Sequence, residues 1–484
     1  MKRHAQGMKS TDVLLDAWRQ TRHRAKDAPA ILDTRRQVLR TFADVEECAR
    51  DFESKLTSFN AGRVIAVQIG NHEDWPSILV ACLRRGLVVL PLEKSISDQQ
   101  RGAALELCRA MVLVTAVSTG NRPEISLLSA ADTAADWGEN PPSLLKLTSG
   151  TTAAPRAIRF RSHQLLADCN QICDTKGITD ADLNFGVIPV SHSYGFSNLL
   201  TPLIARGVAL VLSSDRTPRA VLDDLARTQA TVFPGMPVFY QAFCELENVQ
   251  PLPKLRLCIS AGAPLPAALA KKFAEKFNLR IHSFYGASEC GGICFDREGR
   301  TDAEGFVGQT MTGASIEMFD ARTTSSQIRV RSAAVGDGYF PEPDEDKLGK
   351  GVFVPDDLLA REGSAFRIVG RISDVINVAG KKVNPAEVEA QMLRCPGVRQ
   401  AVVFGRESAL RNEEVAACVV ASAHVSEDDL LRFCREMLSS WQVPKRIFIV
   451  AAVPVNERGK VSRRDLARRF SGAQGSSSLR SLGY

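Results

Sequence analysis

Apolar residues recur at helical spacing in the first part of the chain. Val13, Leu14, Ala17 and Trp18 fall on one face of a helix, and residues 42–56 continue with the same period. The pattern therefore predicts that residues 11–60 are mostly helical.

The next segments alternate between buried strands and helices. Residues 63–69 are rich in β-branched side chains and end at Gly70-Asn71, which is typical of a buried strand followed by a turn. A helix over residues 75–85 and a strand over 87–90 complete a βαβ unit. Further short apolar runs, each followed by a helical pattern, predict an α/β domain with a largely parallel sheet: residues 111–115, 207–212, 230–233 and 255–259.

The pattern changes after about Gly305 to shorter strands and turns. Residues 327–331 predict a strand and residues 336–339, Gly-Asp-Gly-Tyr, a turn, so this part is interpreted as a β-rich subdomain. A hairpin over residues 375–383 then begins a small α+β C-terminal domain, and residues 471–478 are flexible by composition. The remaining elements expected in that domain are residues 385–394, 398–404, 415–421, 428–438 and 446–450.

Composition limits the class of protein. A chain of 484 residues with 44% apolar and 24% charged residues predicts two or more globular domains. The net charge of +6 comes without a dense basic run interleaved with aromatic residues, so nucleic acid is not expected as a partner. The charged N-terminus lacks the pattern of a secretory signal, and we expect no membrane span.

The twelve cysteines are scattered. Cys169 and Cys173, like Cys290 and Cys294, lack the two-residue spacing of a zinc or redox knuckle. We therefore interpret the cysteines as reduced, mostly buried thiols, which favours a cytoplasmic protein.

One stretch combines hydroxyl groups, glycine and a cation. Residues 148–156 read Thr-Ser-Gly-Thr-Thr-Ala-Ala-Pro-Arg and lie between two apolar segments. Backbone N–H groups, hydroxyl groups and Arg156 suit a loop that binds phosphate. An ordinary polar turn is the alternative, because the stretch is not a Walker-type loop.

Six motifs in register resemble the adenylate-forming superfamily, which contains acyl- and aryl-CoA ligases, peptide-synthetase adenylation domains and luciferases. The phosphate loop resembles T-S-G-T-T-G-x-P-K-G, and residues 189–195 resemble P-x-x-H-x-x-G. Residues 260–264, Ser-Ala-Gly-Ala-Pro, resemble the family's adenine-contacting strip. The other three motifs are residues 285–289, which resemble Y-G-x-T-E, Asp357 with Gly370-Arg371, and residues 454–463, which resemble P-x-x-x-x-G-K-x-x-R.

The resemblance implies a fold and domain organisation. The fold is α/β, with a large N-terminal region of two α/β subdomains plus a β-barrel and a small mobile α+β C-terminal domain. We expect an adenylation core over residues 1–371, the mobile domain over 372–470 and a flexible tail over 471–484.

The resemblance also implies chemistry. Converting a carboxylate to an acyl-adenylate brings two anions together, so cations and donors must face the developing charge. Lys460 is expected between the carboxylate and the α-phosphate, Glu289 with Thr151 as ligands of Mg²⁺, and Ser288 as a donor to the α-phosphate. Asp357 would accept from the ribose hydroxyls, with Arg371 nearby. The ATP-binding residues expected in addition are Thr148, Ser149, Gly150, Thr152, Arg156, Gly262, Ala263, Pro264, Tyr285 and Gly286.

Two further sites follow from the resemblance. His192 would gate the path of the carboxylate, although a histidine between apolar strands is often a satisfied core residue. A change of domain orientation about Ser373 and Asp374 would admit the thiol, with Gly380, Lys381 and Lys382 facing pantetheine; exposed lysines in a turn are the alternative. The remaining residues expected to line the acyl pocket are Tyr194, Gly195, Gly235, Met236, Ala287 and Gly291.

The chain departs from the family pattern at several positions. Ala153 and Ala157 replace glycines, and an alanine held at positive φ costs about 1 kcal/mol. Arg156 replaces a lysine, Ser373 replaces the usual Asp or Lys, and Asp356 adds a negative charge beside Asp357.

The leading hypothesis is an ATP-dependent acyl- or aryl-CoA ligase that uses ATP, Mg²⁺ and coenzyme A. A standalone adenylating enzyme that loads the phosphopantetheine of a carrier protein is the second hypothesis, and a non-catalytic nucleotide- or acyl-binding homologue is the third. The identity of the acid and the oligomeric state stay open.

Overall fold

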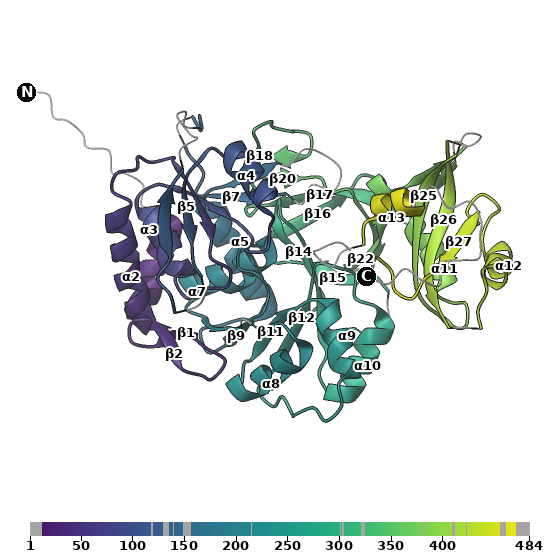
Figure 1. Ribbon diagram of the computed structural model, residues 1–484, viewed down its shortest axis with the longest axis horizontal. Helices are drawn as coiled ribbons and strands as arrows, with labels where there is room; N and C mark the ends of the chain where they lie inside the picture. The colour runs from purple at the N-terminus through teal and green to yellow at the C-terminus, as the bar shows by residue number, and fades with distance from the viewer. Residues whose placement is uncertain are drawn as a thin grey trace, which may run out of the picture. The chain divides into compact units, whose positions relative to one another are not determined.

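A computed structural model describes most of the chain and divides it into two units (Figure 1). The first unit comprises Met1–Phe319, Ile328–Pro355 and Arg361–Arg367, and the second comprises Asp320–Gln327, Asp356–Ala360 and Ile368–Tyr484. The described residues are 12–470 apart from 118–119, 129–134, 139, 149–155, 214, 301, 303, 321–324, 380, 409–411, 423 and 455–460.

A seven-stranded sheet of the first unit is built around β3 (Val64–Gln68), whose five residues are all buried. Its β-branched side chains suit a strand covered on both faces. It pairs in parallel with β4 (Val88–Pro91) and β5 (Ala110–Thr115), which confirms the predicted βαβ unit through α3 (Trp75–Arg84). The order is β18-β8-β7-β4-β3-β5-β6, with β6 (Glu124–Leu127), β7 (Leu144–Leu147), β8 (Ala157–Phe160) and β18 (Gly338–Phe340).

The second sheet of this unit has a parallel run in the order β1-β10-β9-β11-β12-β13. Three of the apolar runs predicted as strands lie here, so the largely parallel sheet is confirmed. Antiparallel strands then extend it through β14, β15 and the first residues of β22. The bounds are β1 (Pro29–Leu32), β9 (Leu183–Gly186), β10 (Ala209–Leu212), β11 (Val232–Gly235), β12 (Leu257–Ser260), β13 (Ile281–Ala287), β14 (Gly291–Phe295), β15 (Phe306–Thr310) and β22 (Ala365–Arg371).

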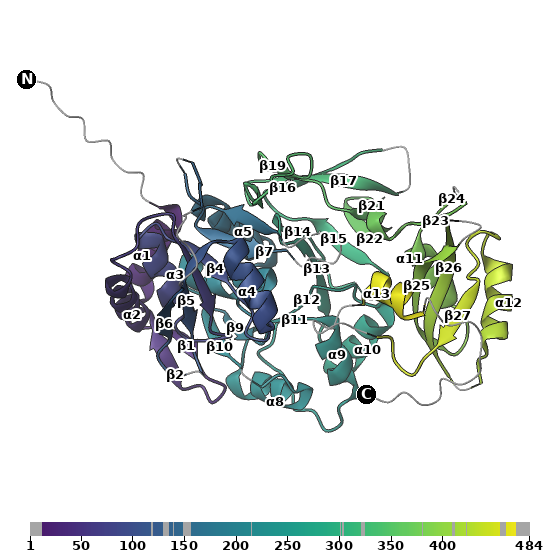
Figure 2. The ribbon, with the colours of Figure 1, turned by 45° about the horizontal axis from the view of Figure 1, so that its top comes forward.

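Helix α5 (Ser162–Lys176) lies between these two sheets (Figures 1 and 2), and the π-helical turn η1 (Phe196–Leu200) packs against it. Lys146 of β7 contacts η1 from one sheet, and Lys176 at the end of α5 contacts Phe284 of β13 in the other. The other helices of the unit are α1 (Val13–Ala25), α2 (Phe42–Lys55), α4 (Asp98–Leu107), α6 (Ser193–Gly195), α7 (Thr201–Arg206), α8 (Pro218–Thr228), α9 (Pro237–Glu245) and α10 (Ala267–Phe277).

The prediction of a mostly helical segment over residues 11–60 is wrong in its middle. Between α1 and α2 the chain forms β1 and β2 (Val38–Thr41), an antiparallel pair at the edge of the second sheet. Pairing of β1 with β10, far away in the sequence, fixes these four-residue strands. Such a long-range contact leaves no helical or alternating pattern for periodicity to detect.

The β-rich part expected after Gly305 contains short antiparallel strands. Hairpin β16 (Ala314–Met318) and β17 (Ser325–Ser332) continues to β20 (Val352–Phe353) and β19 (Leu348–Gly349). Among the described residues no sheet closes on itself, so the fold is a mixed α/β fold in which the expected β-barrel is not shown.

The second unit has the hairpin, helix and strands that were predicted for it. Its sheet has the order β24-β23-β26-β25, with β27 in parallel beside β26, and a core that includes Val383, Val388 and Leu430. Strand β21 (Asp357–Glu362) begins in this unit, and its last two residues belong to the first unit. The other elements of the second unit are η2 (Ile372–Asp374), β23 (Ile376–Val378), β24 (Lys381–Val383), α11 (Pro385–Met392), β25 (Val398–Ser408), β26 (Asn412–Ala421), α12 (Glu427–Met437), β27 (Arg446–Ile449) and α13 (Arg463–Phe470).

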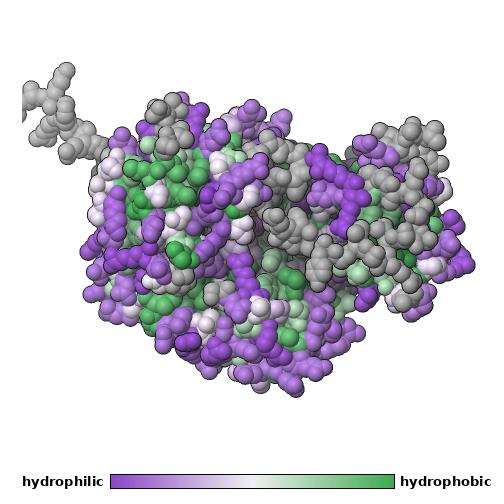
Figure 3. Space-filling view, in the orientation of Figure 1, coloured by the Kyte–Doolittle hydropathy of each residue, from purple (hydrophilic) through white to green (hydrophobic). Residues whose placement is uncertain are grey.

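Burial follows composition in the usual way. All twelve cysteines are free and all except Cys48 are buried, which confirms the expected burial of the thiols. On the face of the first unit seen in Figure 3, apolar residues are interspersed with polar ones. The described helices include none with the length and apolarity that crossing a membrane requires.

Candidate functional site

The stretch expected to bind phosphate, residues 148–156, has contacts between its two ends. Thr148, which follows β7, donates its backbone N–H to the carbonyl of Arg156 at 2.8 Å, and its hydroxyl donates to the same oxygen at 3.2 Å. Antiparallel pairing of β7 and β8 continues from this point, with Leu147 opposite Ala157. The expected residues Ser149, Gly150, Thr151 and Thr152 lie outside the described residues, as does Ala153.

Arg156, Tyr339 and Glu289 form a line of contacts. The guanidinium of Arg156 lies 5.3 Å from the centre of the Tyr339 ring and 3.6 Å from a carboxylate oxygen of Asp344. The Tyr339 hydroxyl donates to Glu289 Oε1 at 3.1 Å. Burial, with the charge of Glu289, raises the pKa of Tyr339, so this phenol stays a neutral donor. These contacts connect the phosphate loop to the expected metal ligand.

Sequence reasoning missed Tyr339 as a site residue. Residues 336–339 were predicted to form a turn, and nothing in their sequence indicated that the tyrosine would contact Glu289. The fold brings the two together because the Gly336 N–H donates to the Glu289 carbonyl at 2.9 Å and β18 pairs with β8.

Ser193 joins two of the motifs directly. Its hydroxyl donates to the Ser288 hydroxyl at 2.9 Å, although the two residues are far apart in the sequence. The structure therefore places the His192 segment against the Tyr285–Glu289 segment, which extends from β13.

His192 is exposed and is the N-cap of α6. Its Nδ1 accepts from the Tyr194 N–H at 3.4 Å, and its own backbone N–H donates to the Pro189 carbonyl at 3.1 Å. The alternative of a satisfied core histidine is therefore wrong. The side chain stands at the surface of the segment in which the carboxylate gate was expected.

Gly195 lets this segment fold back on itself. A Cβ atom at this position would lie 2.0 Å from the Pro189 carbonyl oxygen and 3.1 Å from the Cα of Val190. Only glycine fits this approach of backbone to backbone.

Gly291 has a similar constraint on the other segment. Its φ is +68°, and a Cβ atom would lie 2.0 Å from Asp168 Oδ1. The same Asp168 oxygen accepts the Gly292 N–H at 3.2 Å. Asp168 on α5 thus fixes the turn that follows Glu289, a role that nothing in the sequence pattern signalled.

The other expected pocket residues gather near the ends of β11, β12 and β13. Gly235 ends β11 and Met236 is the N-cap of α9. A Cβ atom on Gly262 would lie 3.9 Å from Met236 Sδ, so the acyl and adenine strips are neighbours. Gly262, Ala263, Pro264 and Gly286 are exposed, Ala287 is half-buried and Tyr285 is buried.

Tyr194 turns inward. Its ring lies 5.9 Å from that of Phe284, and its hydroxyl is buried with no hydrogen-bond partner among the described residues. Burial raises the pKa of this phenol well above its ordinary value. The phenol is therefore a neutral group.

The concern about strain at Ala157 is not supported. Ala157 is fully buried in β8 and is absent from the described residues with positive φ. An alanine in a strand has ordinary backbone geometry, so this departure from the family pattern carries no conformational cost.

In the second unit, Asp357 and Arg371 form an ion pair. Arg371 Nε donates to Asp357 Oδ1 at 2.6 Å, and the aspartate is 6% exposed. The two residues expected at the ribose are therefore brought together.

Asp374, one of the expected hinge residues, contacts Arg463. Arg463 donates to Asp374 Oδ2 at 2.7 Å, to Glu389 Oε1 at 2.7 Å and to the Val403 carbonyl at 2.9 Å. Ser373 lies beside Asp374 in η2. Arg463 is the last residue of the motif that contains Lys460, so part of that motif packs within the unit.

The strip expected to face pantetheine lies at the hairpin of β23 and β24. Lys381 and Lys382 are exposed, and the Lys381 ammonium lies 3.9 Å from the centre of the Trp441 ring. Gly380 and Lys460 lie outside the described residues.

Two family models match this chain. The model described as AMP-binding enzyme matches residues 18–340, and the model described as AMP-binding enzyme C-terminal domain matches residues 387–460. The chain belongs to the AMP-binding enzymes. The superfamily predicted from the six motifs, and with it an AMP-forming ligase type of enzyme, is confirmed.

Two curated relatives of this family member are similar over nearly their whole length. A probable CoA ligase of Humulus lupulus is 26% identical over 501 residues, which cover 92% of this chain and 95% of that protein. A 3,4-dihydroxybenzoate–[aryl-carrier protein] ligase of Bacillus anthracis is 27% identical over 427 residues, which cover 86% of this chain and 95% of that protein.

Solved structures share the fold of this AMP-binding enzyme. ATP-bound MatB of Rhodopseudomonas palustris superposes with a TM-score of 0.83 at 23% identity, over 94% of this chain and 99% of that one. The o-succinylbenzoate CoA synthetase of Bacillus subtilis in complex with its acyl-adenylate gives 0.78 at 22% identity, over 93% and 97%.

Proposed function

We propose that this chain is an ATP-dependent acid–thiol ligase that makes an acyl- or aryl-CoA thioester through an acyl-adenylate. The main support for the proposal is the hydrogen bond between Ser193 and Ser288. It joins the segment of His192, the expected carboxylate gate, to the segment of Ser288, the expected donor to the α-phosphate. Relatives named as CoA ligases support the thioester product.

The first half-reaction joins two anions. A carboxylate oxygen attacks the α-phosphorus of ATP, the bond between the α-phosphorus and its bridging oxygen breaks, and pyrophosphate leaves. Lys460 lies between the carboxylate and the α-phosphate in this proposal, and Ser288 donates to the α-phosphate. Arg156, held near Tyr339 and Asp344, faces the β- and γ-phosphates with the loop residues.

The chemistry of the residues expected at the nucleotide and metal sites fits these ligands. Asp357 accepts from the ribose hydroxyls and Arg371 holds its carboxylate. A carboxylate flanked by a phenol donor is a hard oxygen ligand that suits Mg²⁺ with a nucleotide, so Glu289 and Thr151 are its proposed ligands. Bound there, Mg²⁺ would neutralise phosphate charge.

The second half-reaction uses the other unit. The thiolate sulfur attacks the acyl carbon, the acyl–phosphate bond breaks, and AMP leaves. We propose residues 372–470 as the mobile domain, with Ser373 and Asp374 as its hinge and residues 471–484 as a tail, and Gly380, Lys381 and Lys382 along the path of pantetheine. We propose that the antiparallel strands β14 to β17, β19 and β20 belong to a β-barrel. The buried free thiols favour the cytoplasm.

The decisive assay is carboxylate-dependent exchange of labelled pyrophosphate into ATP, across fatty, aryl and short dicarboxylic acids. The parent protein should support exchange with at least one acid. Lys460→Ala should abolish exchange while keeping thioester formation from supplied acyl-AMP, and Lys254→Ala, an exposed lysine of the first unit, is the control. No exchange with any acid, or equal loss of both half-reactions in Lys460→Ala, would contradict the proposal.

A carrier protein as thiol acceptor is the second candidate. The relative from Bacillus anthracis is named as an aryl-carrier protein ligase, and the adenylation chemistry is shared. With the acid that supports exchange, CoA and a pantetheinylated carrier are offered in turn. Thioester formation with the carrier alone would replace CoA in the proposal.

A further inference from the structure

Two lysines are buried between the sheets of the first unit. Lys146 of β7 is 6% exposed, and Lys176 in the last turn of α5 is 5% exposed. The side chains that accept hydrogen bonds from these ammonium groups are neutral, Asn198 for Lys176 and Ser197 for Lys146. A buried ammonium without an ion pair is costly, so its retention points to a role.

Both ammonium groups contact one short turn. Lys176 Nζ donates to Asn198 Oδ1 at 2.7 Å, and Lys146 Nζ donates to Ser197 Oγ at 3.5 Å. Ser197 and Asn198 are consecutive residues of η1, which follows the His192–Gly195 segment at once. A π-helical turn is a rare conformation that needs support from its surroundings.

Asn198 also contacts the candidate acyl site. Its Nδ2 donates to the Tyr194 carbonyl at 2.9 Å, and its own carbonyl accepts from Asn184 Nδ2 at 3.1 Å. The side chain thus bridges the Lys176 ammonium and the backbone of the segment that contains His192.

Lys176 also contacts the other half of the site. Its Nζ lies 3.4 Å from the centre of the Phe284 ring, and Phe284 directly precedes Tyr285 and packs against Tyr194. A cation over a ring face is attracted to it, and more strongly in a dry environment. One ammonium group therefore touches both segments that Ser193 and Ser288 join.

The surroundings determine the charge of Lys176. Burial lowers its pKa to about 7, and attraction by Asp168 and Cys173 opposes that effect. Burial also lowers the pKa of Lys146, against the attraction of Asp168, Cys290 and Glu289. These are the ionisable groups that face the two lysines. The Lys176 contact with the ring thus changes strength in the neutral pH range.

We propose that Lys176, with Lys146 beside it, is a positioning residue for carboxylate binding. Lys176 contacts Asn198 in η1 and Phe284 in β13. By these two contacts it keeps the segment of His192 and Tyr194 next to the segment of Ser288. This role rests on the proposed function and acts on the acid, because the ammonium group of Lys176 contacts Asn198 and Phe284, which lie beside His192, Tyr194 and Ser288.

The test is Lys176→Met in the pyrophosphate exchange assay with the full chain. The KM for the carboxylate should rise about tenfold, as expected for losing a hydrogen bond to a charged group, while the KM for ATP changes less than about twofold. The control is Lys276→Met. Lys276 also lies in the last turn of its helix, donates to the Cys244 carbonyl at 3.1 Å and lies 5.8 Å from the Phe277 ring, but it is exposed.

A second variant separates the hydrogen bond of Lys176 from its charge. Lys176→Gln keeps a donor for Asn198 without the charge, so it should recover part of the carboxylate KM. The pH profile of kcat/KM for the carboxylate should contain an ionisation near pH 7 in the parent, and this ionisation should be missing in both variants. If Lys176→Met does not fold, Lys176→Gln gives both readouts, and Lys146→Met, which keeps the Lys176 ionisation, gives the carboxylate KM alone.

The outcomes are distinguishable. No exchange in the parent protein with any acid overturns the proposed function and this role together. Exchange in the parent with an unchanged carboxylate KM and an unchanged pH profile in the variants overturns the positioning role alone. Equal rises in the KM for ATP and for the carboxylate would also overturn it, because they indicate general disruption.

Discussion

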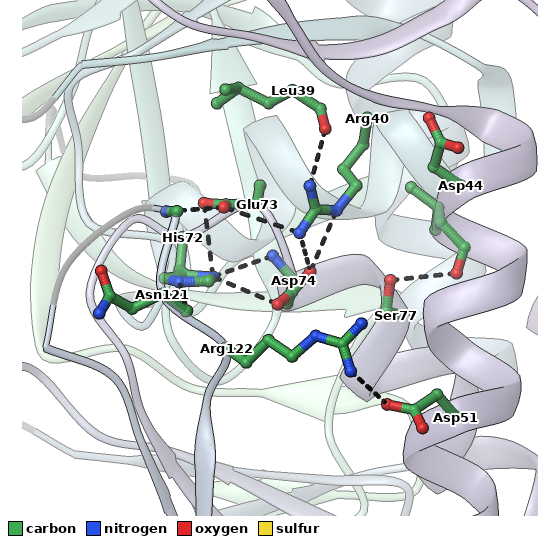
Figure 4. Close-up of polar contacts among 12 residues, drawn as sticks. Leu39, Arg40, Asp44, Asp51, His72, Glu73, Asp74, Ser77, Asn121 and Arg122 are labelled. Atoms are coloured by element: carbon green, nitrogen blue, oxygen red, sulfur yellow. Dashed lines mark hydrogen bonds and ion pairs between the residues drawn. The ribbon is translucent and has the colours of Figure 1, made fainter.

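Two buried polar clusters of the first unit differ in how their charges are balanced. The Arg40 cluster comprises Arg40, His72, Glu73 and Asp74, near the end of β3 and the start of α3 (Figure 4). The lysine pair comprises Lys146 and Lys176, under the candidate acyl site.

In the Arg40 cluster, the cation faces carboxylates. Arg40 Nη2 lies 3.0 Å from Asp74 Oδ1 and 3.7 Å from Glu73 Oε1, and Glu73 Oε1 also accepts the Gly120 N–H at 2.8 Å. His72 Nδ1 accepts from the Asp74 N–H at 3.1 Å, and its Nε2 is 3.0 Å from the Asn121 carbonyl, which fits a neutral ring that donates from Nε2. Figure 4 shows these side chains pointing toward one another.

The difference separates a structural cluster from a positioning one. The Arg40 cluster ties β2, α3 and the segment after β5 together through opposite charges, so its removal should reduce stability without changing ligand binding. The lysine pair donates to neutral acceptors, Ser197 and Asn198. These hydrogen bonds offset only part of the free energy that removing the ammonium groups from water costs. Its removal should change binding of the acid more than stability.

Arg40→Met should have the largest effect on stability. It leaves the 3% exposed Asp74 without its cation, and breaking a buried ion pair costs about 3 kcal/mol at the lower end of the usual range. Chemical denaturation should show this loss, with the carboxylate KM unchanged in the folded fraction. The double variant Arg40→Met with Asp74→Asn should recover part of the stability. A changed KM would erase the distinction between the clusters.

Lys176→Met should change how stability depends on pH. The folded-state pKa of about 7 lies below the ordinary 10.5, so between these values the unfolded chain binds the extra proton. The free energy of unfolding of the parent should therefore rise with pH relative to the variant, by at most about 1.4 kcal/mol per pH unit. Below pH 7 the difference should be constant. Urea denaturation at several pH values measures it, and a difference that falls from pH 7 to 10 would contradict the burial of a charged amine.

Ser193→Ala should have a smaller effect, confined to the site. It removes one neutral hydrogen bond to Ser288, worth about 1 kcal/mol, so kcat/KM for the carboxylate should fall about fivefold. Ser191→Ala, two residues earlier, is the matched control. An effect as large as that of Lys176→Met on the KM would show that the Ser193 contact, rather than the lysine, determines the position of the segment.

Ala157→Gly should have the smallest effect and serves as a test of local strain. Because Ala157 has strand geometry in β8, glycine should destabilise the chain by about 0.5 kcal/mol through added freedom of the unfolded chain. Thermal unfolding measures the change. Stabilisation by glycine would mean that the alanine is strained after all.

Sequence patterns determined most elements of the fold but not all of their partners. The apolar run of β3 and the helical face of α3 are local signals, and both lie where they were predicted. The pair β1 and β2 was missed because its four-residue strands depend on pairing with β10. Local sequence patterns also give no information on whether the β-rich part closes into a barrel. In the second unit the order of hairpin, helix and strands followed directly from periodicity.

The candidate site shows the same division. The motifs around His192, Ser288, Glu289 and Asp357 could be found in sequence because their chemistry needs particular residue types at fixed spacing. Tyr339, Asp168 and Lys176 could not, because each contacts a residue that is far away in the sequence, Glu289, Gly292 and Phe284 respectively.

By itself, the sequence determined the superfamily and the order of most elements, because these depend on local composition and spacing. Only the tertiary structure decided that Ser193 meets Ser288, that Tyr339 donates to Glu289, and that two lysines lie buried against one π-helical turn. The physical reason is that hydrogen bonding and desolvation depend on what surrounds a side chain, and those surroundings come from strands and helices that the chain order keeps far apart.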